Sequence, residues 1–308
     1  MNPTLRQLGF LVAIADTGSF TAAADQAAVT QPSLSAAIKE LEAILGARLV
    51  ERARAGARLT PAGEEAVRRA RAIMAAVGEM GSAVRGASEP LAGPFRLGVI
   101  PTIAPFLLPR ALPAVKARYP RLKLYLREDL TGRLVEGLRA HTLDAALIAL
   151  PYESHSIETL ALMDDEFLFI STPGHPLQSK AELVPGDLAT EPLLLLEDGH
   201  CLRDHALGMC GTVRPGEDEV RATSLFTLVQ MAAGGLGVSL LPRLAADAGL
   251  GAEGVSARRF DPPLIGRQIG IAWRRGSARA EEARALGLLM APNTPSTQNP
   301  GTRGVPGL

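Results

Sequence analysis

Residues 19–46 read SFTAAADQAAVTQPSLSAAIKELEAILG. Ser19 or Thr21 can cap a first short helix, and the following Thr-Gln-Pro places Pro32 at the first position of a second helix. Apolar residues then recur at a spacing of three or four, which predicts a helix from about Pro32 to Leu45 with one buried stripe. The members of that stripe are Leu34, Ile38, Leu41 and Leu45. The stretch therefore predicts two helices joined by a tight turn.

The residues that follow predict a basic loop and then a long helix. Residues 48–58 contain Arg48, Arg52, Arg54 and Arg58 against the single acid Glu51. From Pro61 onward, apolar and small residues alternate at spacings of three and four, which predicts a helix with a short coiled-coil seam. The seam comprises Val67, Ala70, Met74, Val77, Gly81 and Val84. This helix is either a dimerising stalk, which we favour, or a solvent-exposed linker.

Residues 88–94 contain two prolines and a glycine, and strands alternate with helices after them. Strands are expected at 95–100, 122–128 and 143–149, with helices near 103–118 and 131–140, and this order predicts a parallel sheet. Further strands are expected at 167–171, 193–196, 238–240 and 270–273, followed by a helix at 278–290. Two α/β lobes with a cleft fit this pattern, and residues 292–308 are expected to form a disordered tail.

Composition bounds the class of protein. The chain has 308 residues, 47% of them hydrophobic, with 32 basic and 32 acidic side chains, so any basic surface must be local. No charged N-terminal segment precedes an apolar run, and no apolar stretch reaches the roughly 20 residues of a membrane span. Two cysteines cannot build a disulfide framework. We therefore expect a cytoplasmic globular protein without membrane contact, in which any cysteine pairing is regulatory.

The N-terminal stretch resembles the helix-turn-helix of LysR-type transcriptional regulators, in SFTAAA at 19–24 and in QPSLS at 31–35 with the residues that follow. The resemblance implies a mainly α winged helix-turn-helix domain at 3–60 (helix-turn-helix about 20–39), a dimerisation linker helix at 61–88, and a two-lobed α/β regulatory domain, similar to periplasmic binding proteins, at 91–290. The predicted readers of promoter DNA are Gln31, Ser33, Ser35 and Lys39. The wing would place Arg52, Arg54 and Arg58 at backbone phosphates, unless the loop is merely solvated.

Residues 193–210 read LLLLEDGHCLRDHALGMC. Cys201 follows Asp-Gly at the start of a polar helix, a position that stabilises a thiolate. His200 and Arg203 can add positive charge or hydrogen-bond donors near the sulfur, and Asp204 can hold Arg203 in place. The sequence therefore predicts a reactive thiol.

The same segment resembles the redox segment of the OxyR subfamily, whose members sense hydrogen peroxide. The resemblance implies that Cys201 and Cys210 form a reversible disulfide and that Thr102 and Thr131 position the peroxide. Helix capping is an equally good role for both threonines. Nine residues of helix would separate the two cysteine Cα atoms by about 13 Å, whereas a disulfide requires roughly 4.4 to 6.8 Å. Oxidation would therefore have to refold this segment.

The resemblance also implies RNA polymerase as a partner, a homodimer or homotetramer, and a thiol reductant system that resets the switch. We expect no cofactor and no metal, because His200, Cys201 and His205 lack a second compact ligand pair. Two other functions remain open. The chain could be a LysR-type regulator that binds a small organic effector between the lobes, or, more distantly, a thiol peroxidase.

Overall fold

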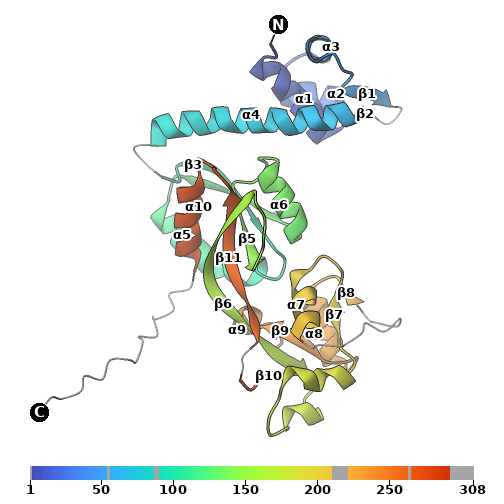
Figure 1. Ribbon diagram of the computed structural model, residues 1–308, viewed down its shortest axis with the longest axis vertical. Coiled ribbons are helices and arrows are strands. Elements are labelled where there is room, and N and C mark those ends of the chain that lie inside the picture. The colour runs from blue at the N-terminus through green and yellow to red at the C-terminus, as the bar shows by residue number, and fades with distance from the viewer. Residues whose placement is uncertain (1, 54–55, 87–89, 210–220, 263–264, 292–308) are drawn as a thin grey trace, which may run out of the picture.

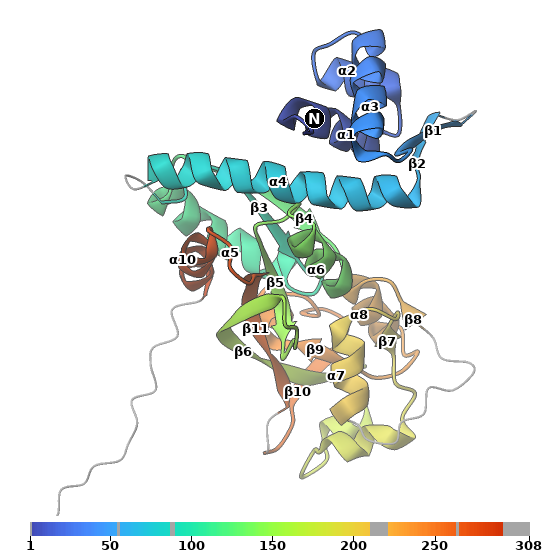
Figure 2. The same cartoon turned by 45° about the horizontal axis from the view of Figure 1, so that its top comes forward.

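The computed structural model describes residues 2–53, 56–86, 90–209, 221–262 and 265–291, and has a helical head, one long helix and an α/β body (Figure 1). The head consists of α1 (Leu5–Thr17), α2 (Phe20–Gln26), α3 (Gln31–Leu45) and an antiparallel hairpin of β1 (Val50–Ala53) and β2 (Gly56–Leu59). The long helix α4 (Pro61–Gly86) runs between the head and the body (Figure 2).

The head encloses its own hydrophobic core. Ala23 and Ala24 of α2 are buried where the helices meet, and α3 contributes Leu34, Ile38 and Leu41. Leu45, expected in the same stripe, is 45% exposed because it lies in the last turn of α3, beyond the core. The stripe is therefore correct for three of its four positions.

The predicted seam on α4 is wrong at its first two positions. Val67 and Ala70 are buried in the core of the head, because the first half of α4 packs against α1. Arg71 and Asp16 add an ion pair between the same two helices. Farther along α4, Met74 and Val77 are 40% and 39% exposed. Among the described side chains of α4, Met74 and Val77 therefore remain for another partner, together with the exposed Ile73 and Met80. The burial of the predicted seam members Gly81 and Val84 lies outside what the structure describes.

The first lobe of the body contains the expected parallel strands. β3 (Gly93–Val99) pairs in parallel with both β4 (Leu122–Glu128) and β5 (Ala145–Leu150). α5 (Ala104–Arg118) and α10 (Ala280–Met290) pack together on one face, and α6 (Thr131–Arg139) lies on the other (Figure 1).

Two long antiparallel strands, β6 (Ile157–Ser171) and β11 (Gly266–Arg274), join the lobes. Sequence analysis found only the apolar end of β6, because the acidic run at 164–166 interrupts its pattern. The second lobe is built around that end, where β9 and β10 pair with β6. Its remaining elements are η1 (Pro176–Gln178), η2 (Pro185–Thr190), β7 (Leu195–Leu196), α7 (Cys201–Met209), β8 (Arg221–Ala222), α8 (Leu225–Ala233), β9 (Ser239–Pro242), α9 (Arg243–Asp247) and β10 (Ser256–Arg259).

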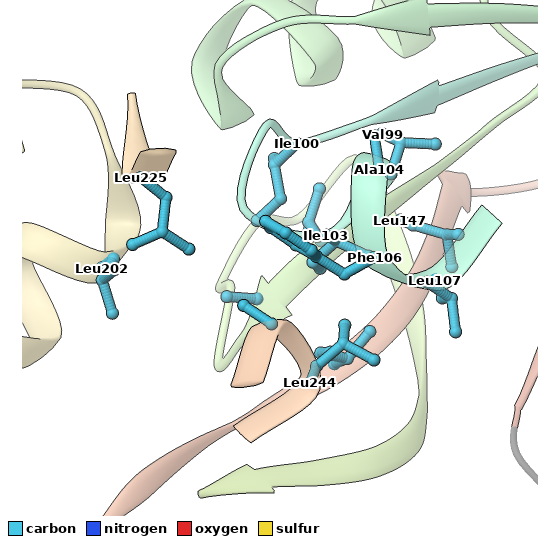
Figure 3. Packing of buried hydrophobic residues seen from close by; sticks show 14 of the residues in the cluster. Val99, Ile100, Ile103, Ala104, Phe106, Leu107, Leu147, Leu202, Leu225 and Leu244 are labelled. Atoms are coloured by element: carbon cyan, nitrogen blue, oxygen red, sulfur yellow. The ribbon is translucent and has the colours of Figure 1, made fainter. Parts of the chain in front are cut away.

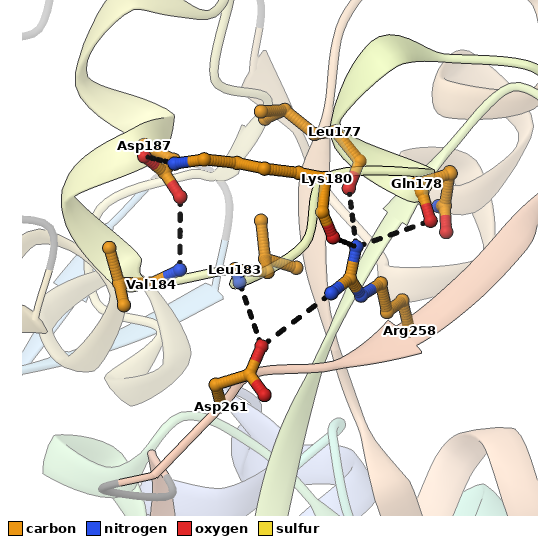
Figure 4. A network of polar contacts seen from close by, with 8 residues as sticks. All are labelled: Leu177, Gln178, Lys180, Leu183, Val184, Asp187, Arg258 and Asp261. Atoms are coloured by element: carbon orange, nitrogen blue, oxygen red, sulfur yellow. Dashed lines mark hydrogen bonds and ion pairs between the residues drawn. The ribbon is translucent and has the colours of Figure 1, made fainter.

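One arginine fixes the irregular segment after β6. Arg258 of β10 donates hydrogen bonds to the carbonyl oxygens of Leu177, Gln178 and Lys180, and its guanidinium lies 3.5 Å from Asp261 (Figure 4). Asp261 also accepts from the backbone of Leu183. The carbonyl groups at the end of η1 thus accept hydrogen bonds from a side chain rather than from the backbone of a strand.

A continuous hydrophobic core extends through both lobes. Ile100, Ile103 and Phe106 project from the first lobe, while Leu202 of α7 and Leu225 of α8 lie on the second-lobe side (Figure 3). Together these elements confirm a helix-turn-helix head followed by a two-lobed α/β domain. Within the described ranges, no helix is both long and apolar enough to cross a membrane.

Candidate DNA interface and thiol crevice

The predicted DNA readers lie on α3, but they do not share one strip of it. Gln31, Ser35 and Lys39 are spaced by four residues and therefore follow one strip of the helix. Ser33 is two residues from Ser35, about 200° around the helix axis, and is exposed on the other side. Lys39 is also exposed, whereas Gln31 and Ser35 are half-buried.

The basic loop is the β1–β2 hairpin, which has the position of a wing beside α3. Arg58 of β2 is exposed, and its register partner on β1 is Glu51. Arg48, just before β1, is exposed as well. Arg54 and the side chain of Arg52 lie outside the described residues.

A narrow crevice lies between the lobes. The first lobe contributes Thr102, after β3, and Thr131, the first residue of α6. The second lobe contributes Gly199, His200 and Cys201 at the start of α7. Ile100, Pro101 and Leu130 complete its lining. The structure thus brings together four of the residues predicted from the sequence.

Cys201 is half-buried at the first position of α7, which confirms that a helix begins at this thiol. The helix N-terminus favours the thiolate over the thiol. Gly199, two residues earlier, has a φ of +92°, a backbone conformation that favours glycine and turns the chain from β7 into α7. Cys210, the second cysteine, lies outside the described residues.

Thr102 is held by a buried ion pair that sequence analysis missed. Arg267 of β11 donates from Nη1 to Thr102 Oγ1 (2.7 Å) and from Nη2 to the Thr102 carbonyl oxygen (3.0 Å). Its Nε donates to Asp165 of β6 at 2.9 Å, and both side chains are at most 1% exposed. Asp165 also accepts from the backbone N–H of Leu244 in α9. Arg267 and Asp165 are 102 residues apart in the chain, so no local motif indicated the pair.

Thr131 supplies the second hydroxyl of the crevice. Its Oγ1 is buried and accepts or donates no hydrogen bond among the residues that the structure describes. The N-cap of α6 is Leu130 and that of α5 is Ile103, so neither threonine caps the helix that follows it. The capping role considered for both residues is therefore wrong.

His200 lies in the crevice, half-buried, and burial lowers its pKa, with the negative charge of Glu197 acting in the opposite direction. Near neutral pH it is therefore mostly uncharged and offers the thiol a polar imidazole rather than a cation.

Arg203 contacts two described partners that the sequence pattern did not indicate. Its guanidinium contacts Asp198 (Nε to Oδ1, 3.0 Å) and donates to the carbonyl oxygen of Leu196. Asp198 also pairs with Arg221 of β8 at 3.1 Å. Arg203 thus fastens α7 to β7 and is not a lining residue of the crevice. The side chain of Asp204 lies outside the described residues.

Two family models match this arrangement. Residues 5–64 match the bacterial regulatory helix-turn-helix protein model of the lysR family, and residues 88–291 match the LysR substrate binding domain. The chain belongs to the LysR family. As a LysR protein it is 41% identical over 286 residues to a probable hydrogen peroxide-inducible genes activator of Mycobacterium avium, with 92% of each chain covered.

Another LysR relative is the HTH-type transcriptional regulator EstR of Acinetobacter baylyi, which is 43% identical over 244 residues, or 79% of this chain and 81% of EstR. Among solved structures, a cysteine-to-aspartate variant of full-length OxyR from Pseudomonas aeruginosa superposes with a TM-score of 0.80 at 35% identity, with 94% of both chains covered. These matches confirm the resemblance to the OxyR group of LysR regulators.

Among the described side chains, no group of three or more His, Cys, Asp or Glu is placed to hold a metal ion.

Proposed function

We propose that this LysR regulator activates transcription in response to hydrogen peroxide through a reversible Cys201–Cys210 disulfide. The crevice supports this proposal most directly. It combines a cysteine at a helix N-terminus with the hydroxyl groups of Thr102 and Thr131. Thr131 Oγ1 lacks a hydrogen-bond partner in the described part of the chain, and a peroxide oxygen in the crevice would supply one.

Thr102 contributes a directed donor. Its oxygen already accepts a hydrogen bond from Arg267, so its own hydrogen can be donated to a peroxide oxygen. The uncharged His200 adds a further polar group, and because it carries no positive charge it does not form an ion pair with the thiolate. These contacts would hold the peroxide and stabilise the charge that develops on its departing oxygen.

The chemistry proceeds in two balanced steps. The Cys201 thiolate attacks one peroxide oxygen, so that an S–O bond forms, the O–O bond breaks, and hydroxide leaves and takes up a proton to become water. The Cys210 sulfur then attacks the sulfenic sulfur; the S–S bond forms, the S–O bond breaks, and a second water is released. Two electrons pass from sulfur to peroxide, and a dithiol reductant returns them during reset.

The second step couples the chemistry to a change of shape. α7 extends about 12 Å from Cys201 to Met209, the residue before Cys210, whereas a disulfide requires Cα atoms roughly 4.4 to 6.8 Å apart. α7 must therefore unwind for the bond to form. Leu202, 3% exposed, then leaves the core shared by the lobes, and the Arg203–Asp198 contact changes with it.

The head would bind promoter DNA through α3 and the wing as part of a homodimer or homotetramer, with boundaries near 3–60, 61–88 and 91–290. The exposed Ile73, Met74, Val77 and Met80 of α4 offer an apolar surface for a second copy. The change in α7 would alter the spacing of the heads and their contact with RNA polymerase.

Two other functions are alternatives to peroxide sensing. A LysR-type regulator could bind a small organic effector between the lobes and use its cysteines only structurally. A thiol peroxidase would use the same chemistry with repeated turnover.

Thiol mapping by mass spectrometry tests the proposal. We expect a Cys201–Cys210 bridge within seconds of adding about one equivalent of hydrogen peroxide to the reduced full-length chain, and no peroxide-induced transcription from the Cys201→Ser variant. Two free thiols, or normal activation of that variant, would contradict peroxide sensing. Sustained peroxide consumption with a thiol reductant would instead indicate a peroxidase.

A further inference from the structure

The wing hairpin is fastened to the head at three points, and one of them is a side chain of the helix proposed to read DNA. Oε1 of Glu42, near the end of α3, accepts hydrogen bonds from the backbone N–H groups of Leu49 (2.8 Å) and Val50 (3.1 Å). Val50 is the first residue of β1, and both Leu49 and Val50 are buried in the core of the head. One carboxylate oxygen thus joins α3 to the first strand of the wing.

The other two points involve β2 and the residue that follows it. Thr60, after β2, donates its hydroxyl to the carbonyl oxygen of Arg48 at 2.6 Å, and its Oγ1 accepts from the backbone of Gly63 in α4. The backbone of Ala57 in β2 donates to the carbonyl oxygen of Gly18 at 2.8 Å. A Cβ at Gly56 would lie 2.5 Å from that same oxygen, so the approach of β2 to the end of α1 requires glycine.

We propose that Glu42 is a positioning residue for DNA binding, which fixes the wing relative to α3 so that wing and helix meet the duplex as one rigid surface. The proposal rests on the proposed DNA-binding function. Glu42 need not touch DNA itself. A carboxylate near a phosphate backbone is repelled by it, so the value of Glu42 lies in holding Arg48 and Arg58 where they can reach phosphates.

The physical reason is that Glu42 supplies the polar contacts of α3 with the base of β1. The hairpin has four residue pairs, and an isolated two-stranded hairpin is marginally stable in water. Without Glu42, two backbone donors at the base of β1 lose their acceptor, and the strand is then held by the buried side chains of Leu49 and Val50, by Thr60 and by its pairing with β2. The wing would then lose its fixed angle to α3.

The test is the salt dependence of DNA binding by the full-length protein. The probe is a 60-base-pair duplex that the wild-type chain selects from a random pool. We expect Glu42→Ala to lower the slope of log affinity against log salt by about 1 to 2, the value for one or two lost phosphate contacts per bound complex, and Glu42→Gln, which keeps an oxygen acceptor, to restore most of it. Merely destabilising the fold reduces the active fraction without changing the slope.

Glu40→Ala is the matched control, because Glu40 is an exposed carboxylate on the same helix and its loss changes the net charge equally. An unchanged slope in Glu42→Ala, or an equal change in Glu40→Ala, would overturn the positioning role. Failure of the wild-type chain to select any sequence would instead refute the proposed DNA-reading function.

Discussion

Arg267 holds Thr102 by two hydrogen bonds, one to the hydroxyl oxygen at 2.7 Å and one to the carbonyl oxygen at 3.0 Å. The two residues are 165 positions apart, on the strand that joins the lobes and on the loop that lines the crevice. Because Arg267 is also paired with Asp165, the position of the Thr102 hydroxyl depends on a buried ion pair.

Arg267→Met should destabilise the folded chain by about 3–5 kcal/mol, because it leaves the Asp165 carboxylate buried without its charge partner. The midpoint of urea unfolding measures the change. Arg259→Met is the control, since the Arg259 side chain is 57% exposed and its partner Glu166 also pairs with Arg243, so the substitution should barely shift the midpoint. Equal shifts in the two variants would mean that burial does not increase the contribution of the Arg267 pair to the free energy of unfolding.

Thr131→Val should slow the oxidation of Cys201 by peroxide without weakening the fold. The buried hydroxyl has no hydrogen-bond partner among the described residues, so an apolar group of the same shape costs little, whereas a hydrogen bond to peroxide is worth about 0.5–1.5 kcal/mol, or about two- to twelvefold in rate. Quenched-flow alkylation followed by mass spectrometry measures the rate. Thr159→Val, at an exposed position in β6, should leave it unchanged. An unaltered oxidation rate in Thr131→Val would show that this hydroxyl does not contribute to the proposed peroxide site.

Gly208→Ala should make the disulfide harder to form. Gly208 lies in α7, is exposed, and has open space where a Cβ would point. Alanine stabilises a helix over glycine by about 1 kcal/mol, so the equilibrium constant for disulfide formation should fall about fivefold if oxidation unwinds α7. Titration in glutathione redox buffers, read by mass spectrometry, measures it.

Gly78→Ala makes the same change in α4, where glycine is also exposed with open space around it, and should leave the equilibrium constant unaltered. A disulfide that forms as readily in Gly208→Ala as in the wild type would show that α7 does not unwind on oxidation.

His200 should make stability depend on pH. Burial lowers its pKa below the ordinary value of 6.5, so between the two values the unfolded chain binds more protons than the folded one, and stability rises with pH. As the pH falls below about 6.5, the wild type should lose stability that His200→Gln keeps. Urea midpoints from pH 5 to 7.5 test this; parallel curves for the two proteins would exclude the histidine as the cause.

Much of the thiol crevice could be anticipated from the sequence, because its residues lie where elements end. Thr102 follows a strand, Thr131 opens a helix, and Cys201 follows an Asp-Gly turn, and each of these transitions has a local signal. The partners of these residues had no such local signal in the sequence. Arg267 stands in a strand whose pattern gave no reason to expect an ion pair, and no local pattern indicated the contact of Arg203 with Asp198.

The local amino-acid sequence alone determined the helix-turn-helix, the parallel strands of the first lobe and the position of Cys201 at the start of a helix. Helix caps, helix-breaking residues and apolar spacing all act over a few residues. Only the tertiary structure decided which faces those elements bury. Val67 and Ala70 face the head rather than a seam, since α4 packs on α1, and Glu42 meets Leu49 only because the chain turns back after α3. Contacts between distant segments depend on how elements pack, and no short-range pattern encodes that packing.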